Sequence, residues 1–402
     1  MQFDANGGTN APANITIHAD MNGSANVSIP QTIPTRSGYI FTGWWTATTG
    51  GSEIFEGWSV FSQDTTIYAR WDIIVLTLAE QLRGIQDNAQ SNTEYIINVN
   101  ADESISPHTL SYGNRTNITI TLRSSSARTV SLSSNGAMFT VGTGVTLVLE
   151  NNITLRGRAN NNNSLIVVNG TFRMSGGTIS GNTSNNYSTG GVHVNSGTFT
   201  LSGGTISGNT GDLCGGVTVV NNSTFTMSSG TVSGNTGGGV VVGGSTFTMR
   251  GGNISGNTGI DVGGVMITIG YDSALGYNRA ANFTMSDGTI SENTVAGSLV
   301  FDGGGGVYVY ENCTFTMSGG VISGNIVTGL GGGGVYVFRN GIFNKSGGGI
   351  IYGNDAASAN RNTASSGGHA VYWSSSPNRF RNTTLNTNNN ISTSNTSVGW
   401  GQ

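Results

Sequence analysis

The chain has 402 residues, of which 65 are glycine and only 9% are charged, and its formal net charge is −4. Average soluble domains contain about 7% glycine and ~25% charged residues, and a helical protein would need far more lysine and glutamate on its surface. Glycine does not recur at every third position and there are only 5 prolines, which excludes a collagen-like chain. The exterior must consist of serine, threonine, asparagine and glycine, which favours β-structure with many turns.

The distribution of charged and apolar residues excludes several partners. Lysine and arginine form no cluster, so we expect no nucleic-acid-binding surface. The longest apolar run, at 73–78, is far too short to span a bilayer, so we expect no membrane insertion. Cys214 and Cys313 are too few for a disulfide scaffold. The histidines are isolated and show no zinc-site spacing, so we predict no metal site and no cofactor.

Three landmarks occur in order within residues 1–72. They are Phe-Asp-Ala-Asn-Gly-Gly-Thr at 3–9, Pro-Thr-Arg-Ser-Gly-Tyr at 34–39 followed by Gly-Trp-Trp at 43–45, and Asp-Thr-Thr-Ile-Tyr-Ala-Arg-Trp at 64–71. Together they resemble the internalin B-repeat, also called the Listeria–Bacteroides repeat. The resemblance implies a small β-grasp-like module at 1–72, of a kind associated with display and spacing in bacterial surface proteins. The family usually has apolar strand residues before the first landmark, so we expect a truncated first strand here.

Residues 77–90 form the one helix that the pattern predicts. Thr77 and Glu80 fit a capping box, and apolar residues then recur at helical spacing. A helix in front of a long β-region covers the open end of a stack of strands, which would otherwise expose apolar side chains and unpaired backbone groups. We therefore assign 73–93 as a helical cap and linker.

From residue 94 onward the chain is a repeat. A unit close to Thr-Phe-Thr-Met-Ser-Gly-Gly-Thr-Ile-Ser-Gly-Asn recurs every 22 to 36 residues, with Gly-Gly-Val-x-Val ahead of it and an aliphatic residue seven positions after each phenylalanine, the last being Ile350. Because strand side chains alternate and coils stack at ~4.8 Å, like residues fall above one another inside the stack. We predict one structural ladder of phenylalanines, Phe172, Phe199, Phe225, Phe247, Phe283, Phe315 and Phe343, and one of asparagines, Asn182, Asn209, Asn235, Asn257, Asn293, Asn325 and Asn354.

These units predict an all-β fold class. Three short strands per unit form one coil of a parallel β-helix, and 94–402 would hold about ten coils and a C-terminal cap, right-handed by the crossover rule for parallel strands. The pattern resembles bacterial adhesin-like β-helix proteins and, more generally, the pectin-lyase-like superfold. This resemblance is specific for architecture and says little about function.

The outward position of the Gly-Gly-Val-x-Val segment becomes aromatic in the last coils. Such a strip would stack on sugar rings or pack against a partner; alternatively, its rings stack on one another and stabilise the sheet. The candidate binding patch consists of Tyr308, Tyr310, Tyr336, Phe338 and Tyr372.

An irregular coil with an insertion near 270–281 collects much of the chain's acidic content. Paired carboxylates or a calcium site in this coil would indicate an enzyme that cleaves polysaccharides. We favour the alternative, a coil that bulges into solvent and gathers polar residues, because no two acids alternate on one strand. The acidic group consists of Asp261, Asp272, Asp287, Glu292, Asp302 and Glu311.

These features favour a fragment of a secreted bacterial surface protein, with its signal peptide and anchor outside the fragment. We interpret it as an adhesin-like rod without catalytic residues. Two alternatives stay open: a polysaccharide-binding or polysaccharide-cleaving β-helix, and a self-assembling extracellular filament subunit. The expected partners are a host or environmental glycan, a protein, or another copy of the chain bound through the β-helix ends or the N-terminal module.

Overall fold

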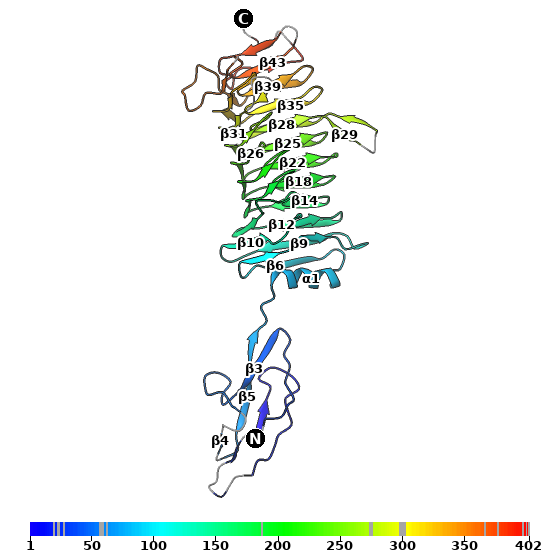
Figure 1. Ribbon diagram of the computed structural model, residues 1–402, viewed down its shortest axis with the longest axis vertical. Helices are drawn as coiled ribbons and strands as arrows, with labels where there is room; N and C mark the ends of the chain where they lie inside the picture. The colour runs from blue at the N-terminus through cyan, green and yellow to red at the C-terminus, as the bar shows by residue number, and fades with distance from the viewer. Residues whose placement is uncertain are drawn as a thin grey trace. The chain divides into compact units, whose positions relative to one another are not determined.

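The structure is a computed structural model of the chain. It describes residues 1–18, 21, 25–26, 29–55, 60–61, 63–185, 188–272, 276–296, 303–365, 367–375, 378–395, 398 and 400. The chain divides into two compact units, Met1–Leu76 and Thr77–Gln402. Regular structure in the described residues is almost entirely β, with one short helix (Figure 1).

The first unit is built on a three-stranded sheet. Its central strand, β5 (Thr66–Ile73), lies between the parallel strand β1 (Gln2–Asp4) and the antiparallel strand β3 (Tyr39–Trp45). A separate antiparallel pair is formed by β2 (Ala25–Asn26) and β4 (Val60–Phe61). Phe3 and Trp44 meet edge to face in the small apolar core, with ring centroids 5.1 Å apart.

The turn of the first landmark is shaped by Trp71 of the third. Asn6 and Gly7 have φ of 46° and 83°, left-handed values that asparagine and glycine tolerate best. A Cβ on Gly8 would lie 2.5 Å from the Trp71 ring, so glycine is what lets the chain pass so close to it. The indole N–H of Trp71 also donates to the carbonyl oxygen of Ala5 at 2.9 Å. The first and third landmarks therefore pack against each other at this turn.

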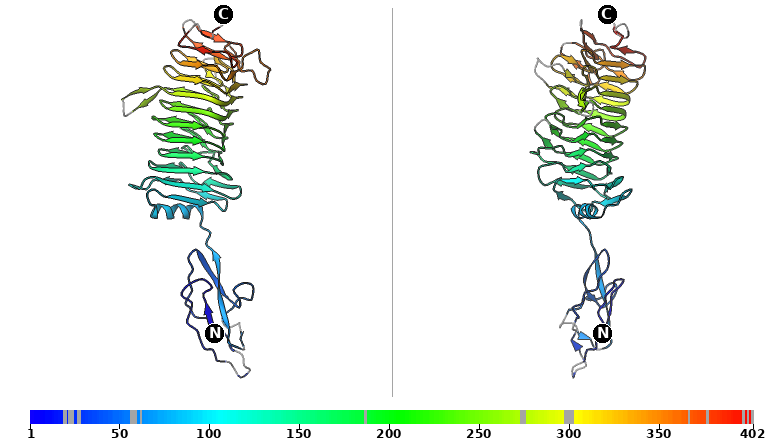
Figure 2. Two further views of the ribbon diagram at one scale, coloured as in Figure 1. Left: turned by 180° about the vertical axis from the view of Figure 1, so that it is seen from behind. Right: turned by 90° about the vertical axis from the view of Figure 1, so that its right-hand side faces the viewer.

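The second unit begins with α1 (Leu78–Asn88). Thr77 Oγ1 accepts from the backbone N–H of Glu80 at 3.2 Å, and the Glu80 carboxylate accepts from the backbone N–H of Thr77 at 2.8 Å. The backbone N–H of Leu78 donates to the carboxylate of Glu103 at 2.8 Å. Because the apolar face of α1 joins the same buried cluster as the first strands, the helix covers the first coil (Figure 2).

Beyond α1 the chain winds through stacked parallel sheets, the arrangement of a β-solenoid (Figures 1 and 2). The largest sheet holds the strands β6 (Glu94–Asn98), β7 (Glu103–Ile105), β9 (Ile118–Arg123), β10 (Arg128–Leu132), β12 (Val145–Leu149), β13 (Ile153–Arg156), β15 (Thr171–Met174), β16 (Thr178–Ser180), β19 (Thr198–Leu201), β20 (Thr205–Ser207), β23 (Thr224–Met227), β24 (Thr231–Ser233), β26 (Thr246–Ser255), β31 (Asn282–Ser291), β35 (Thr314–Met317), β36 (Val321–Ser323), β40 (Ile342–Lys345), β41 (Ile350–Ile351) and β45 (Ile391–Ser392).

A second sheet carries the Val-x-Val segments. Its strands are β8 (His108–Leu110), β11 (Phe139–Val141), β14 (Ile166–Val168), β18 (Val192–Asn195), β22 (Val217–Val220), β25 (Val240–Gly243), β28 (Val265–Thr268), β34 (Val307–Val309), β39 (Val335–Phe338), β43 (Val371–Ser374) and β44 (Arg379–Arg381). In the described residues, four small sheets complete the unit. One pairs β17 (Thr183–Ser184) with β21 (Thr210–Gly211), and another pairs β33 (Gly303–Gly304) with β38 (Gly331–Gly332). A four-stranded sheet holds β27 (Thr258–Gly259), β32 (Thr294–Val295), β37 (Ile326–Val327) and β42 (Thr363–Ala364), and β29 (Gly270–Asp272) forms an antiparallel hairpin with β30 (Tyr277–Arg279).

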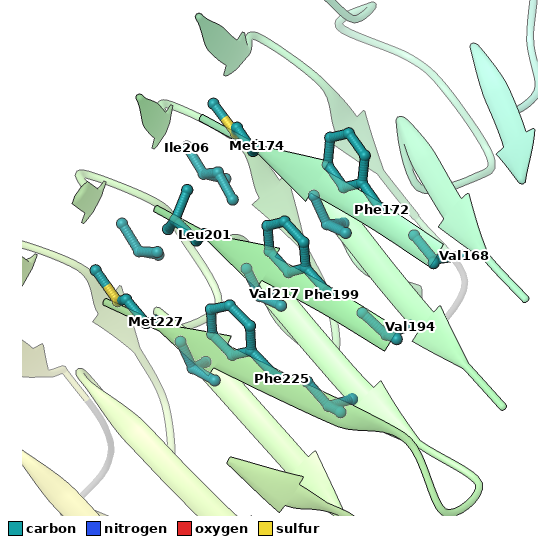
Figure 3. Packing of buried hydrophobic residues seen from close by; sticks show 14 of the residues in the cluster. Val168, Phe172, Met174, Val194, Phe199, Leu201, Ile206, Val217, Phe225 and Met227 are labelled. Carbon is teal, nitrogen blue, oxygen red and sulfur yellow. The ribbon is translucent and has the colours of Figure 1, made fainter. Parts of the chain in front are cut away.

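The seven phenylalanines form one continuous stack inside the solenoid. Figure 3 shows the first three, with aliphatic and methionine side chains around them. Neighbouring ring centroids lie 4.6 to 5.1 Å apart and the rings are tilted by at most 16° from parallel. All seven are buried, at 0 or 1% exposure. Since each ring between the two ends lies between two others, the stack links every coil from Phe172 to Phe343.

A ladder of buried asparagines runs along one corner of the same coils. In most steps the Oδ1 of one asparagine accepts from both the backbone N–H and the Nδ2 of the asparagine one coil earlier, as Asn257 does from Asn235 at 3.0 and 2.9 Å. The Nδ2 also donates to a backbone carbonyl of the preceding coil, so both the oxygen and the nitrogen of the side-chain amide are hydrogen-bonded between coils. The ladder consists of Asn182, Asn209, Asn235, Asn257, Asn293, Asn325 and Asn362.

The last coil departs from the predicted register in two places. Asn354 is exposed, and the final position of the asparagine ladder is taken by Asn362. Likewise Ile350 pairs with Val321, whereas Ile351 pairs with Ile322 and is fully buried. The cause is an extra glycine before Ile350 and a loop at 352–361, which separate these residues from the spacing of the earlier coils.

The final coil is closed by antiparallel strands and by a buried lysine. β44 runs antiparallel to β43, and β45 antiparallel to β40. Lys345, the only lysine in the sequence, stands in register with Met317 and is 2% exposed. Its Nζ donates to the carbonyl oxygens of Asn386 and Asn389 at 2.8 and 2.7 Å. An ammonium thus replaces an apolar side chain where the stack ends, and it binds the returning chain.

Lys345→Met is expected to loosen this closure without unfolding the rest of the stack. Methionine is what the preceding coil carries, but it removes the charged donor to the carbonyls of Asn386 and Asn389, a loss of about 1.5–3 kcal/mol per charged hydrogen bond. Limited proteolysis should cut within 378–395 much faster in the variant. Equal cleavage rates there, with Arg250→Met at an exposed position as control, would show that the lysine does not hold the closure.

Candidate binding surface

Strands β34, β39 and β43 bring the predicted tyrosines into one column. Tyr308 pairs in register with Tyr336, and Tyr336 with Tyr372. Their ring centroids lie 5.1 and 5.6 Å apart. All three project from the outer face of the sheet, because the residues on either side of each tyrosine along the strand, valines except for Trp373, pack towards the interior cluster.

The predicted exposure of this column is wrong for two of its members. Tyr336 is fully buried and Tyr308 is 7% exposed. They pack with Cys214, Val241 and Val262 in a second apolar cluster on the outer side of the sheet. Cys214 and Val262 come from the loops that precede the Val-x-Val strands, so side chains of those loops help to cover the outer face. Tyr308 and Tyr336 therefore have a structural role.

A smaller aromatic edge stays accessible at the end of these strands. We use this name for Tyr310, Phe338, Arg339, Tyr372 and Phe380. Tyr310 and Phe338 stack at 5.3 Å, and Tyr372 and Phe380 at 6.3 Å. The Arg339 guanidinium lies 4.8 Å above the Phe338 ring and 3.6 Å from the carboxylate of Glu311. Phe380 is 49% exposed, whereas Tyr310, Phe338 and Tyr372 are half-buried.

The acidic group is not assembled into one site in the described residues. Asp261 and Asp287 are exposed; Asp287 pairs in register with Arg250 and accepts from the backbone N–H of Gly288. Glu292 is exposed at φ 58°, where other coils carry glycine, and Glu311 faces Arg339. Asp272 ends β29, but Asp302 and the side chain of Asp272 lie outside the described residues. Within the described part, no three acidic, histidine or cysteine side chains form a group able to hold a metal ion.

Among the described residues, the most exposed tyrosines are two that do not belong to the predicted binding patch. Tyr271 and Tyr277, from β29 and β30, are 63% and 58% exposed. Figure 1 shows this hairpin projecting from the coil. The signal was present, because an insertion at 270–281 breaks the repeat and carries both residues.

Both cysteines are free and buried. Burial raises the pKa of the Cys214 thiol to about 11, and that of Cys313 also to about 11. Since the thiolate is the reactive form, Ellman's reagent at pH 8 should detect no thiol in the native chain and both after unfolding. Rapid reaction of the native chain would contradict the burial of these two side chains.

The model of one known family matches part of the chain. Residues 1–70 match the Listeria-Bacteroides repeat domain (List_Bact_rpt). This match confirms the predicted Listeria–Bacteroides repeat, a domain typical of bacterial cell-surface proteins. No curated protein and no solved structure matches the chain. No helix in the described residues is long and apolar enough to cross a membrane. The chain thus combines a bacterial surface repeat domain with a β-solenoid.

Proposed function

We propose that the chain is a non-catalytic, adhesin-like rod of a bacterial surface protein, which holds a binding surface away from the cell. Its first unit, a β-grasp-like Listeria–Bacteroides repeat, would act as a spacer, and its second unit would be a right-handed parallel β-helix of about ten coils. The observation that carries the proposal is the continuous phenylalanine stack. It joins successive coils through rings 4.6 to 5.1 Å apart, as a stiff support requires.

The two ends of the solenoid favour a separate rod over a filament. α1 covers the first coil, and the antiparallel strands β44 and β45 with Lys345 close the last. Parallel stacking of one chain on another would have to displace these elements. Self-association through the ends of the solenoid is therefore disfavoured. These caps do not affect association through the first unit.

Glycan binding is the second candidate function. The stacked rings of the aromatic edge and the exposed tyrosines of the β29–β30 hairpin favour it, because flat aromatic faces pack well against sugar rings. Cleavage has less support, since no three acidic, histidine or cysteine side chains of the described residues come together as a catalytic calcium site would require.

The test is to incubate the full chain with a panel of polysaccharides and to apply it to a glycan array and an array of extracellular proteins. The rod proposal expects binding without any release of reducing ends or unsaturated sugars. Release of such products would overturn the non-catalytic reading. If Phe338→Ala and Tyr271→Ala both leave every array signal unchanged, then a protein-binding surface elsewhere on the rod replaces the glycan alternative.

A further inference from the structure

Charge is distributed in bands along the second unit. Residues 77–103 carry five acids and one arginine, 104–211 six arginines and one glutamate, 212–311 seven acids and two arginines, and 312–402 five basic residues and one aspartate. Because the chain advances one coil at a time, order along the sequence is order along the solenoid (Figure 1). The bands alternate in sign, so a second solenoid that runs in the opposite direction would place a band of opposite charge beside each of them.

The outer face of the largest sheet presents a regular array of hydroxyl groups. Because its strands pair in register, the outward residues of successive coils stand in columns. One column consists of Arg173, Thr200, Thr226, Thr248, Thr284 and Thr316. Another consists of Arg156, Ser180, Ser207, Ser233, Ser255, Ser291 and Ser323. We call the outer surface of this sheet from β13 to β36 the threonine face.

Charged side chains stand towards the two ends of the threonine face. Arg156 and Arg173 begin the two columns, and both are exposed. Asp287 and Glu292, also exposed, lie in β31 and directly after it. Arg250 pairs in register with Asp287. The middle of the face, formed by β19, β20, β23 and β24, carries no charged side chain.

A two-fold axis along β23 and β24 makes the threonine face complementary to itself. Half a turn about this axis reverses the direction of the solenoid and keeps the direction of the strands. Since β15 and β31 lie two coils before and two coils after β23, Arg173 of one copy then faces the strand that carries Asp287 in the other, and the same contact forms twice. Arg156 comes within one coil, about 4.8 Å, of Glu292, an offset that its long side chain can span.

We propose that two copies of the chain pair side by side and antiparallel through the threonine face. Arg156 and Arg173 of each copy contact Asp287 and Glu292 of the other, and the uncharged threonine and serine columns lie against each other between these contacts. For an adhesin-like rod the partner would then be the same rod on a second cell. That role rests on the proposed function, whereas the pairing itself does not.

Sedimentation velocity of the full chain tests the pairing. At low ionic strength we expect a dimer that forms with rising concentration. In ~1 M salt, where the Debye length is about 3 Å, the dissociation constant should be at least about tenfold higher. A chain that stays monomeric at low ionic strength would overturn the proposal, and so would a dimer that salt leaves unchanged.

Charge reversal identifies the contacts. Arg156→Glu with Arg173→Glu should abolish the dimer, and so should Asp287→Lys with Glu292→Lys, because like charges then face each other. An equimolar mixture of the two double variants should pair again, since the reversed charges of one variant match those of the other. Asp64→Lys, in the first unit, should leave the dimer intact. A mixture that stays monomeric would show that the copies do not meet through these residues.

Cross-linking distinguishes antiparallel from parallel pairing. Thr226 lies on the proposed axis, so it faces its own equivalent about 10 Å away, and a short bis-maleimide should join two copies of Thr226→Cys. Thr316 stands three coils further along the same column, so an antiparallel pair keeps Thr316→Cys far from its equivalent, whereas a parallel pair would treat both variants alike. Both native cysteines are buried. Equal cross-linking of the two variants would contradict the antiparallel arrangement.

Discussion

Asn257→Ala is expected to lower the free energy of unfolding of the solenoid by about 3–5 kcal/mol, although it removes only one small side chain. The Oδ1 of Asn257 accepts from the backbone N–H and the Nδ2 of Asn235, and its Nδ2 donates to Asn293 Oδ1 and to the carbonyl oxygen of Val232. All three asparagines are buried at 0 or 1% exposure, so no water replaces these bonds. Denaturant unfolding of the variant and the natural chain measures the loss.

Asn354→Ala is the matched control for this substitution. The repeat pattern places Asn354 in the same ladder, but the structure leaves it exposed, with Asn362 in its place. We therefore expect Asn354→Ala to change stability by no more than about 0.5 kcal/mol. Similar losses for Asn257→Ala and Asn354→Ala would mean that the last coil follows the predicted register and that the observed ladder is wrong.

Phe247→Ala should cost about as much for a different reason. Phe247 lies in the middle of the stack, with ring centroids 4.6 Å from Phe225 and 4.7 Å from Phe283. Its removal leaves a cavity between two rings that the backbone ladders hold in place, and large-to-small changes at such sites cost about 3–5 kcal/mol. Phe247→Leu keeps part of the volume and should cost clearly less. Calorimetry or denaturant unfolding of both variants checks the order.

A loss below about 1 kcal/mol for Phe247→Ala would mean that the coils adjust to fill the gap, because cavity formation then contributes little. In that case the stack would not be the feature that makes the rod stiff. The leucine variant distinguishes loss of volume from loss of ring stacking, since it retains an apolar side chain but no aromatic face.

The interior of the solenoid was predictable for two reasons. The same residues recur in successive coils, and side chains along each strand point alternately into the solenoid and towards its surface. Phe172, Phe199 and Phe225 stack as the two-residue period requires, and α1 begins with the capping box seen in the sequence. The pattern failed where the spacing changes. In the last coil the extra glycine and the loop 352–361 move the buried positions to Ile351 and Asn362.

The outer face was less predictable for a physical reason. Tyr308 and Tyr336 do point away from the interior, yet apolar side chains of other coils bury them. Which outward position is covered depends on the lengths of the corner loops.

Native-state hydrogen exchange followed by mass spectrometry tests the central claim most directly, namely that the second unit is one continuous stack that can serve as a stiff support. The structure predicts that amides of the middle strands, β19 to β35, exchange slowest and at similar rates, and that protection decreases towards α1 and towards β44 and β45. In Asn257→Ala, protection should fall on both sides of the substituted coil. Fast exchange in β23, β26 and β31 of the natural chain would contradict a continuous rod.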